Sequence, residues 1–154
     1  MNEHKVDQAE LEKIDIFRIL QEFGKAMGRL WWLVLVLAVA CGGALGAAGR
    51  YAVSLLPVQA GFPVLTLVTN LLGAVLIGFV VGYGSAGGMT PNQILFWKTG
   101  VCGGFTTFST FSLEALTLLE SGRVAAGGAY MALSLGLCLG GVLLGRALGI
   151  RAAA

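Results

Sequence analysis

The residues best suited to chemistry form one block, residues 103–112, which reads Gly-Gly-Phe-Thr-Thr-Phe-Ser-Thr-Phe-Ser. Phenylalanine recurs at every third position, and the other five residues after the two glycines carry hydroxyl groups. Glycine costs about 1 kcal/mol relative to alanine inside a helix, so Gly103 and Gly104 predict a break in a helix. Hydroxyl groups can bond backbone groups that such a break frees, and freed carbonyl oxygens can hold a cation. A single hydroxyl bonded back to its own helix is the ordinary alternative, but the block as a whole favours the break.

Two pairs of polar residues, Thr66 with Asn70 and Tyr130 with Ser134, are each spaced four positions apart. Residues at this spacing lie on the same face of a helix. An amide in an apolar segment is costly unless it finds a partner, so Asn70 must bond a neighbouring helix or a passing solute. Each pair alone is typical of contacts between helices. Together with the block they predict a polar track along a helical bundle.

Candidates for catalysis or for side-chain metal ligation are few. His4 is the only histidine, and it lies in the polar N-terminal segment. The cysteines Cys41, Cys102 and Cys138 are odd in number and match no metal-site spacing, so we expect small buried side chains. Because no nucleophile, base and orienting group can be assembled, an enzyme is the least favoured class.

The composition places these residues in a membrane protein. Charged residues are 12% of the 154-residue chain and apolar residues 56%, whereas soluble domains carry about 25% charged residues. Eleven of the eighteen charged residues lie at or before Arg29, which leaves a body that is nearly free of charge. No basic run indicates a nucleic-acid partner. We therefore predict a polar leader, residues 1–29, and a transmembrane domain, residues 30–154.

Four membrane spans fit the body, since a spanning helix needs about 20 apolar residues. The uncharged run from Leu30 to Gly49 predicts the first span. Prolines at positions 57, 63 and 91 separate the next segments, which predict spans at residues 64–82 and 94–119. After a turn at residues 120–123, a fourth span is expected at residues 124–148. The fold class is thus all-α, with the block interrupting the third span.

The leader has the pattern of an amphipathic helix. Its apolar residues follow steps of three and four, at Leu11, Ile14, Phe17, Leu20, Phe23 and Met27. An interfacial helix that lies on the membrane or docks on a partner is one interpretation, and a charged appendage is the other. A third interpretation is that translation starts at Met27.

Glycines recur four residues apart throughout the spans. Such pairs let helix backbones approach closely in lipid. The spacing predicts a tight bundle and a dimer, and the glycines concerned are Gly42/Gly46, Gly78/Gly82, Gly100/Gly104, Gly136/Gly140 and Gly141/Gly145/Gly149.

With these features in place, the body resembles the small bacterial fluoride channels of the Fluc, or CrcB-like, type. The resemblance extends from about Leu30 to the C-terminus. The most specific match is the block at residues 103–112, followed by Glu114. Further matches are Gly-Ala-Ala-Gly-Arg-Tyr at residues 46–51, Thr-Leu-Val-Thr-Asn at residues 66–70, and the Tyr130 and Ser134 spacing.

The resemblance implies an antiparallel, dual-topology homodimer in the bacterial cytoplasmic (inner) membrane, with two passive fluoride pathways that lower fluoride toxicity. It implies a structural sodium ion at the dimer centre, held by the backbone carbonyls of Gly103 and Thr106 from both subunits. Arg50 would gather anions at the vestibule. The residues implied to line the pathway are Asn70, Phe108, Phe111, Thr66, Tyr130, Ser134 and Thr107.

Elementary electrostatics agrees with a weakly binding anion path. The edge of an aromatic ring is positive, so phenylalanine edges and an amide donor give fluoride several weak partners. Conduction needs binding that is favourable enough to enter but weak enough to leave. Fixed positive charges are kept toward the predicted span ends, where Lys98 and Arg146 can reach the interface.

Two other classes remain open at the level of sequence. A small dual-topology drug exporter also has four spans, but that chemistry needs an early membrane carboxylate, and the first two spans contain none. Dependence of cationic dye efflux on Glu114 would favour this exporter. A non-transporting membrane scaffold held by glycine packing would give no ion flux at all.

The leader bears on topology, because Lys25 and Arg29 adjoin the first span and favour the N-terminus inside, whereas the basic residues of the body are nearly balanced. We predict that a chain starting at Met27 transports as well as the full chain in reconstituted liposomes. Loss of transport on truncation would contradict a dispensable leader.

Overall fold

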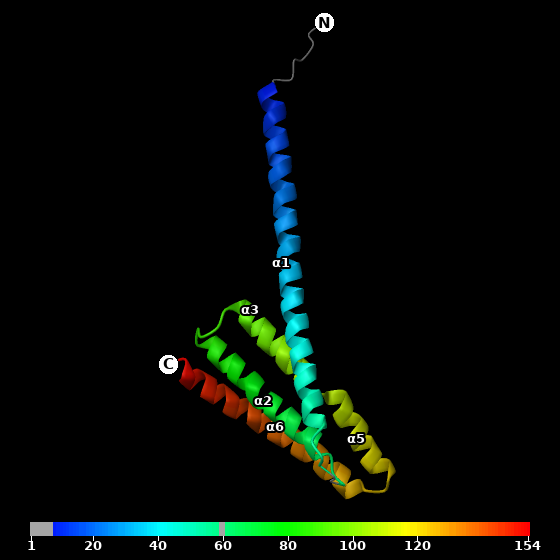
Figure 1. Cartoon of the computed structure of the whole chain (residues 1–154). Coiled ribbons are helices and arrows are strands. Elements are labelled where there is room, and N and C mark those ends of the chain that lie inside the picture. The colour runs from blue at the N-terminus through cyan, green and yellow to red at the C-terminus, as the bar shows by residue number, and fades with distance from the viewer. Residues whose placement is uncertain (1–7, 59–60) are drawn as a thin grey trace. The chain divides into compact units, whose positions relative to one another are not determined.

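The computed structural model describes residues 8–58 and 61–154, with side chains from residue 21 onward apart from those of Phe23, Ala26 and Arg29. Every regular element in these ranges is a helix (Figure 1). The chain divides between Val36 and Leu37 into two compact units, and the second, Leu37–Ala154, contains all the predicted site residues. The arrangement of the site is therefore a property of this second unit alone.

Helix α1 (Gln8–Ser54) joins the leader and the first predicted span without interruption. In its leader part, Lys25 forms an exposed ion pair with Glu22, with 2.9 Å between Nζ and Oε1. The side chains of the predicted apolar stripe lie outside the described residues, except for Met27, which is exposed. The division at residue 30 into leader and channel domain stays a prediction.

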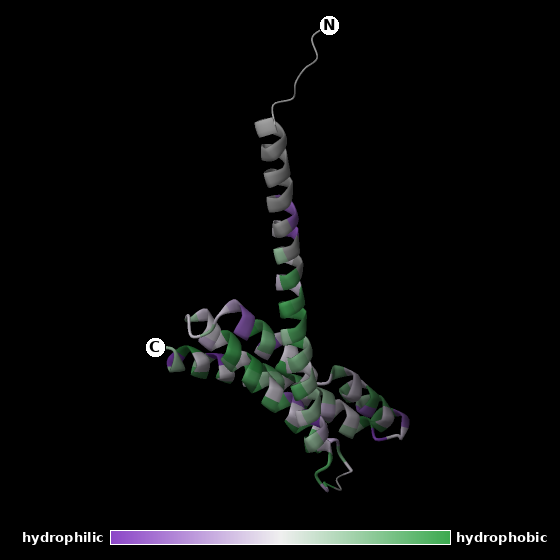
Figure 2. Cartoon of the chain, turned by 45° about the horizontal axis from the view of Figure 1, so that its top comes forward, coloured by the Kyte–Doolittle hydropathy of each residue, from purple (hydrophilic) through white to green (hydrophobic). Residues whose placement is uncertain are grey.

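Three helices are long and apolar enough to cross a membrane: Leu30–Ser54 within α1, α2 (Val64–Ser85) and α6 (Val124–Ala152). Their outer faces carry many exposed leucine, valine and tryptophan side chains, and Figure 2 shows apolar residues along the C-terminal part of α1. Exposed apolar surface on this scale is typical of a face that contacts lipid. The protein is an all-helical, multi-pass membrane protein.

The segment predicted as the third span is divided into pieces. It comprises α3 (Pro91–Ile94), the π-helix η1 (Leu95–Cys102), α4 (Gly103–Phe105) and α5 (Phe108–Glu120). The interruption falls at Thr106 and Thr107, whose backbones are extended, with φ/ψ of −78°/155° and −145°/111°. Its predicted position at Gly103 and Gly104 is wrong, because both glycines are helical in α4.

Packing explains the helical glycines at positions 100 and 104, whereas a Cβ atom on Gly103 would meet nothing within 4 Å. A Cβ atom on Gly104 would lie 3.1 Å from the backbone nitrogen of Ala47, and one on Gly100 would lie 2.9 Å from the Cα of Gly42. The glycines therefore let this segment lie directly against α1, and the interruption comes one turn later. The π-helical winding of η1 has no signal in the sequence.

Local signals set the turns that flank these pieces. Thr90 caps α3 by accepting from the Gln93 N–H, while the Gln93 side chain accepts from the Thr90 N–H, and Pro91 takes the first helical position. The predicted turn at residues 120–123 contains Gly122 with φ of +77°, a conformation that glycine adopts readily.

Glycines bring alternate helices together in parallel pairs. Gly78 and Gly82 of α2 face the backbone of Val142 and Arg146 of α6, and Gly145 of α6 faces the backbone of Val75. The two helices lie side by side in Figure 1. Gly42 and Gly46 of α1 lie against η1 and α4 in the same way, so each of these pairs runs parallel.

Not all the predicted packing glycines have a partner. A Cβ atom on Gly136 or Gly140 of α6 would meet nothing within 4 Å. These two glycines lie on the outer face of α6. Within the described chain, no other helix packs against them as the spacing predicts. Likewise Cys41 is exposed, contrary to prediction, although Cys102 is buried.

The two kinds of glycine predict opposite responses to one added methyl group. Gly145→Ala would place a Cβ atom in steric overlap with the Val75 carbonyl oxygen. Overpacking of this kind lowers the free energy of unfolding by about 1–3 kcal/mol or more. Gly128→Ala, also in α6, should be neutral or stabilising, because a Cβ atom there would meet nothing within 4 Å and alanine is the better helix former. Thermal unfolding of both variants in detergent checks this, and equal midpoints would contradict the packing.

Candidate functional site

The helix interruption is held by one side chain of α2. Asn70 Oδ1 accepts from the Thr107 N–H at 2.8 Å, and Asn70 Nδ2 donates to the Thr107 carbonyl oxygen at 3.1 Å. Thr107 Oγ1 accepts from the Thr110 N–H at 3.3 Å and so caps α5. The amide thus replaces the helical partners that Thr107 lacks, and α5 restarts on a side-chain cap.

The interruption leaves the four carbonyl groups of residues 103–106 without their helical donors. In a continuous helix the Thr107 N–H would bond the Gly103 oxygen and the Thr110 N–H would bond the Thr106 oxygen. Both N–H groups are bonded elsewhere, to Asn70 Oδ1 and to Thr107 Oγ1. Gly103 and Thr106, the two residues predicted to hold sodium, are therefore among these four, and the Gly104 oxygen accepts from Arg50 Nε instead.

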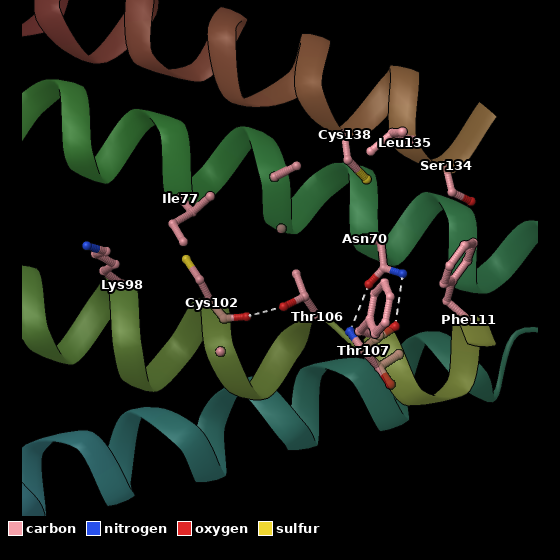
Figure 3. Close-up of a pocket in the computed structure, with 14 residues that line it drawn as sticks. Asn70, Ile77, Lys98, Cys102, Thr106, Thr107, Phe111, Ser134, Leu135 and Cys138 are labelled. Carbon is pink, nitrogen blue, oxygen red and sulfur yellow. Dashed lines mark hydrogen bonds between the residues drawn. The ribbon is translucent and has the colours of Figure 1, made fainter. Parts of the chain in front are cut away.

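A cavity of about 370 Å³ adjoins the interruption (Figure 3). Since a water molecule occupies about 30 Å³, the cavity has room for several. It lies among α2, the pieces of the third segment, and α6. Its lining residues are Asn70, Gly73, Ala74, Ile77, Lys98, Cys102, Gly103, Thr106, Thr107, Phe108, Phe111, Ser134, Leu135 and Cys138.

The cavity wall is mainly apolar and contains a few hydrogen-bond donors. Ser134 is only 7% exposed, and its hydroxyl has no hydrogen-bond partner among the described residues. The Asn70 amide has a second N–H besides the one that bonds Thr107. The Phe108 and Phe111 rings, with centroids 5.4 Å apart, complete this end of the cavity. Such a wall can offer neutral donors to a small anion.

Hydrogen bonds to one carboxylate, that of Glu114, link the helices α2, α5 and α6. Glu114 of α5 accepts from Thr66 Oγ1 of α2 at 2.8 Å and from the Tyr130 hydroxyl of α6 at 2.7 Å. Tyr130 is fully buried, and its ring lies 5.1 Å from that of Phe111. A carboxylate inside an apolar bundle needs such partners. Sequence reasoning missed this role of Glu114, although a lone carboxylate in an apolar span was the available signal.

The predicted site residues therefore separate into three groups. Asn70, Thr107, Phe108, Phe111 and Ser134 line the cavity, together with Gly103 and Thr106. Thr66 and Tyr130 donate to Glu114 and do not line the cavity.

Arg50 forms the third group by itself. Its Nε donates to the Gly104 carbonyl oxygen at 3.2 Å, and it does not line the cavity either. Lys98, which was not predicted as a site residue, does line it.

Comparison with known proteins bears on the same region. A family model described as "CrcB-like protein, Camphor Resistance (CrcB)" matches residues 37–146. A protein of Clostridium novyi (strain NT) is 42% identical over 121 residues, which cover 76% of this chain and 94% of that protein. A protein of Ruegeria sp. (strain TM1040) is 45% identical over 117 residues, covering 73% and 92%.

An archaeal protein, from Methanococcus maripaludis, is 44% identical over 112 residues, covering 72% of this chain and 92% of its own length. All three proteins are named fluoride-specific ion channel FluC. The matched family region coincides closely with the second compact unit and leaves the leader outside it.

Asn70 should be essential for the interruption. Asn70→Asp keeps an acceptor for the Thr107 N–H but places a carboxylate oxygen against the Thr107 carbonyl. A polar group left unpaired costs about 1–3 kcal/mol, so thermal unfolding in detergent should shift to a clearly lower temperature. The matched control is Thr69→Val on the same helix, since Thr69 Oγ1 bonds only its own helix, at Leu65 O. Equal midpoints for the two variants would contradict the role of Asn70.

Proposed function

Since the chain belongs to the CrcB family, we propose that it is a fluoride-selective channel that lets fluoride leave the cell passively and so lowers fluoride toxicity. The observation that carries this proposal is the cavity beside the interrupted helix. Its donors are a free hydroxyl, an amide N–H and aromatic ring edges. Fluoride is small and strongly hydrated, and several weak donors can replace its water without trapping it.

Within this proposal, Asn70 has two tasks. One N–H of its amide and its oxygen hold Thr107, and the remaining N–H donates to fluoride in the cavity. Phe108 and Phe111 offer ring edges, and Ser134 offers its hydroxyl. Thr66 and Tyr130 then act together with Glu114, which extends the polar track past the phenylalanines.

We further propose four membrane spans, the third being the interrupted segment 91–120. The parallel pairing of α2 with α6, and of α1 with η1 and α4, supports this count, because alternate spans cross a membrane in the same direction. The location proposed is the cytoplasmic membrane.

The proposed assembly is an antiparallel homodimer inserted in both orientations. Gly136 and Gly140, which have open space above them within one chain, supply a face on which a helix of a second subunit can approach closely. The exposed Phe108, with 79% of its surface accessible, is a further group that a second subunit would cover.

A structural sodium ion at the dimer centre is also proposed. The Gly103 and Thr106 carbonyls would hold it together with the same carbonyls of the partner subunit. Their loss of helical N–H donors makes these oxygens suitable ligands for a hard cation. The ion would stabilise the dimer because the negative ends of the carbonyl dipoles would otherwise repel one another in a region of low dielectric constant.

Fluoride efflux from liposomes tests the function. The full chain should release fluoride when valinomycin balances the charge, and it should release no chloride under the same gradient. Phe111→Ile removes a ring edge from the cavity wall and should lower fluoride efflux at least tenfold while elution in detergent stays that of the wild type.

Absence of fluoride efflux from folded wild-type protein would contradict the channel and favour a scaffold. Undiminished efflux in Phe111→Ile would contradict the site but leave the channel. Efflux of a cationic dye that depends on Glu114 would favour an exporter.

A further inference from the structure

We propose that Lys98 is the charge that concentrates fluoride at the end of the cavity opposite Phe111, and that it acts without binding the ion at the helix interruption. This inference rests on the proposed channel function. It gives Lys98 a task of the same kind as the one that the family resemblance placed on Arg50.

The position of Lys98 on η1 is the first argument. Lys98 lines the cavity at one end, and Ser134 and Phe111 lie at the other, with Cys102, Thr106 and Asn70 between them (Figure 3). Its side chain is exposed, and none of the side chains that the structure describes forms an ion pair with it. The ammonium group is therefore free to act on ions that approach the cavity.

The chemistry of the rest of the cavity is the second argument. Among the described residues that line it, Lys98 alone carries a formal charge. The end near Ser134 and Phe111 has neutral donors only, including the buried Ser134 hydroxyl, which has no hydrogen-bond partner among the described residues. A charge at the Lys98 end raises the local anion concentration, and neutral donors at the other end keep each fluoride weakly bound.

Two other basic residues of the bundle, Arg50 and Arg146, do not line the cavity. Arg50 donates through Nε to Gly104 O, on the side of the third segment that faces α1. Arg146 of α6 is exposed and does not line the cavity, although its backbone packs against Gly82. Arg146 is therefore a matched control: a basic residue near a span end that has no place in the cavity wall.

Action at a distance has a signature that direct binding lacks. The field of an exposed charge is screened over about 30 Å at 0.01 M salt but over about 3 Å at 1 M. Neutralising Lys98 should thus slow efflux strongly at low ionic strength and hardly at high ionic strength. A residue that binds fluoride directly, or that is needed for folding, would slow efflux equally at both.

The experiment compares wild type, Lys98→Gln, Lys98→Arg and Arg146→Gln as full chains in liposomes. Initial fluoride efflux is measured below saturation, at about 0.01 M and about 1 M of an impermeant salt. At low salt Lys98→Gln should be slower than wild type by about 3- to 10-fold, the range expected for one charge near the path. At high salt the ratio should fall below twofold, while Lys98→Arg and Arg146→Gln should match wild type at both.

The possible results distinguish failure of the Lys98 inference from failure of the channel function. Equal slowing of Lys98→Gln at both salt concentrations, or no slowing at either, would overturn the inference while leaving the channel intact. Slowing of Arg146→Gln to the same extent would also overturn it, because a general surface charge would then suffice. If wild type carries no fluoride at all, the proposed function fails and the inference fails with it. Should Lys98→Gln not fold, Lys98→Glu with the wild-type elution profile must show the same salt-dependent loss, only larger.

Discussion

The pair of hydrogen bonds between the Asn70 side chain and the main chain of Thr107 is the interaction on which the rest of the site depends. An unpaired N–H or C=O group is costly in an apolar medium, so a helix inside a bundle can be interrupted only where something else satisfies its backbone. One amide has both the donor and the acceptor that this requires. With Thr107 held, the Gly103 and Thr106 carbonyls lose their helical donors, α5 restarts on its own cap, and a cavity lies beside the interruption.

The glycines provide the second condition, which is close approach. In lipid there is little hydrophobic drive between helices, so association depends on contact between backbones and on a few polar bonds. Glycines at four-residue steps meet the backbone of a parallel neighbour at both helix pairs of the second unit. Polar bonds also link α5 to α2 and α6, because Glu114 accepts from the Thr66 and Tyr130 hydroxyls.

Much of the architecture was predictable because its signals are local. Prolines and charges mark where α2 and α6 begin, and both helices start at the predicted residues 64 and 124. An interruption of the helix within the block at residues 103–112 was also predictable, since so many hydroxyl groups beside glycines are unusual in an apolar segment. The position of the interruption was not, because the partner of Thr107 is 37 residues away in the chain. The occupation of Arg50 by Gly104 O and the place of Lys98 in the cavity wall depend on contacts of the same long-range kind.

The sequence by itself determined that this chain is a helical membrane protein with a nearly uncharged body and a polar helical leader, because hydrophobicity and helix signals act within short windows. Its motifs also indicated the family to which it belongs. Only the tertiary structure decided which polar groups serve the fold and which remain free for a ligand. That distinction turns on whether a donor finds an acceptor across a helix interface: the Thr66 and Tyr130 hydroxyls find one at Glu114, whereas Ser134 and one N–H of Asn70 find none among the described residues and face the cavity.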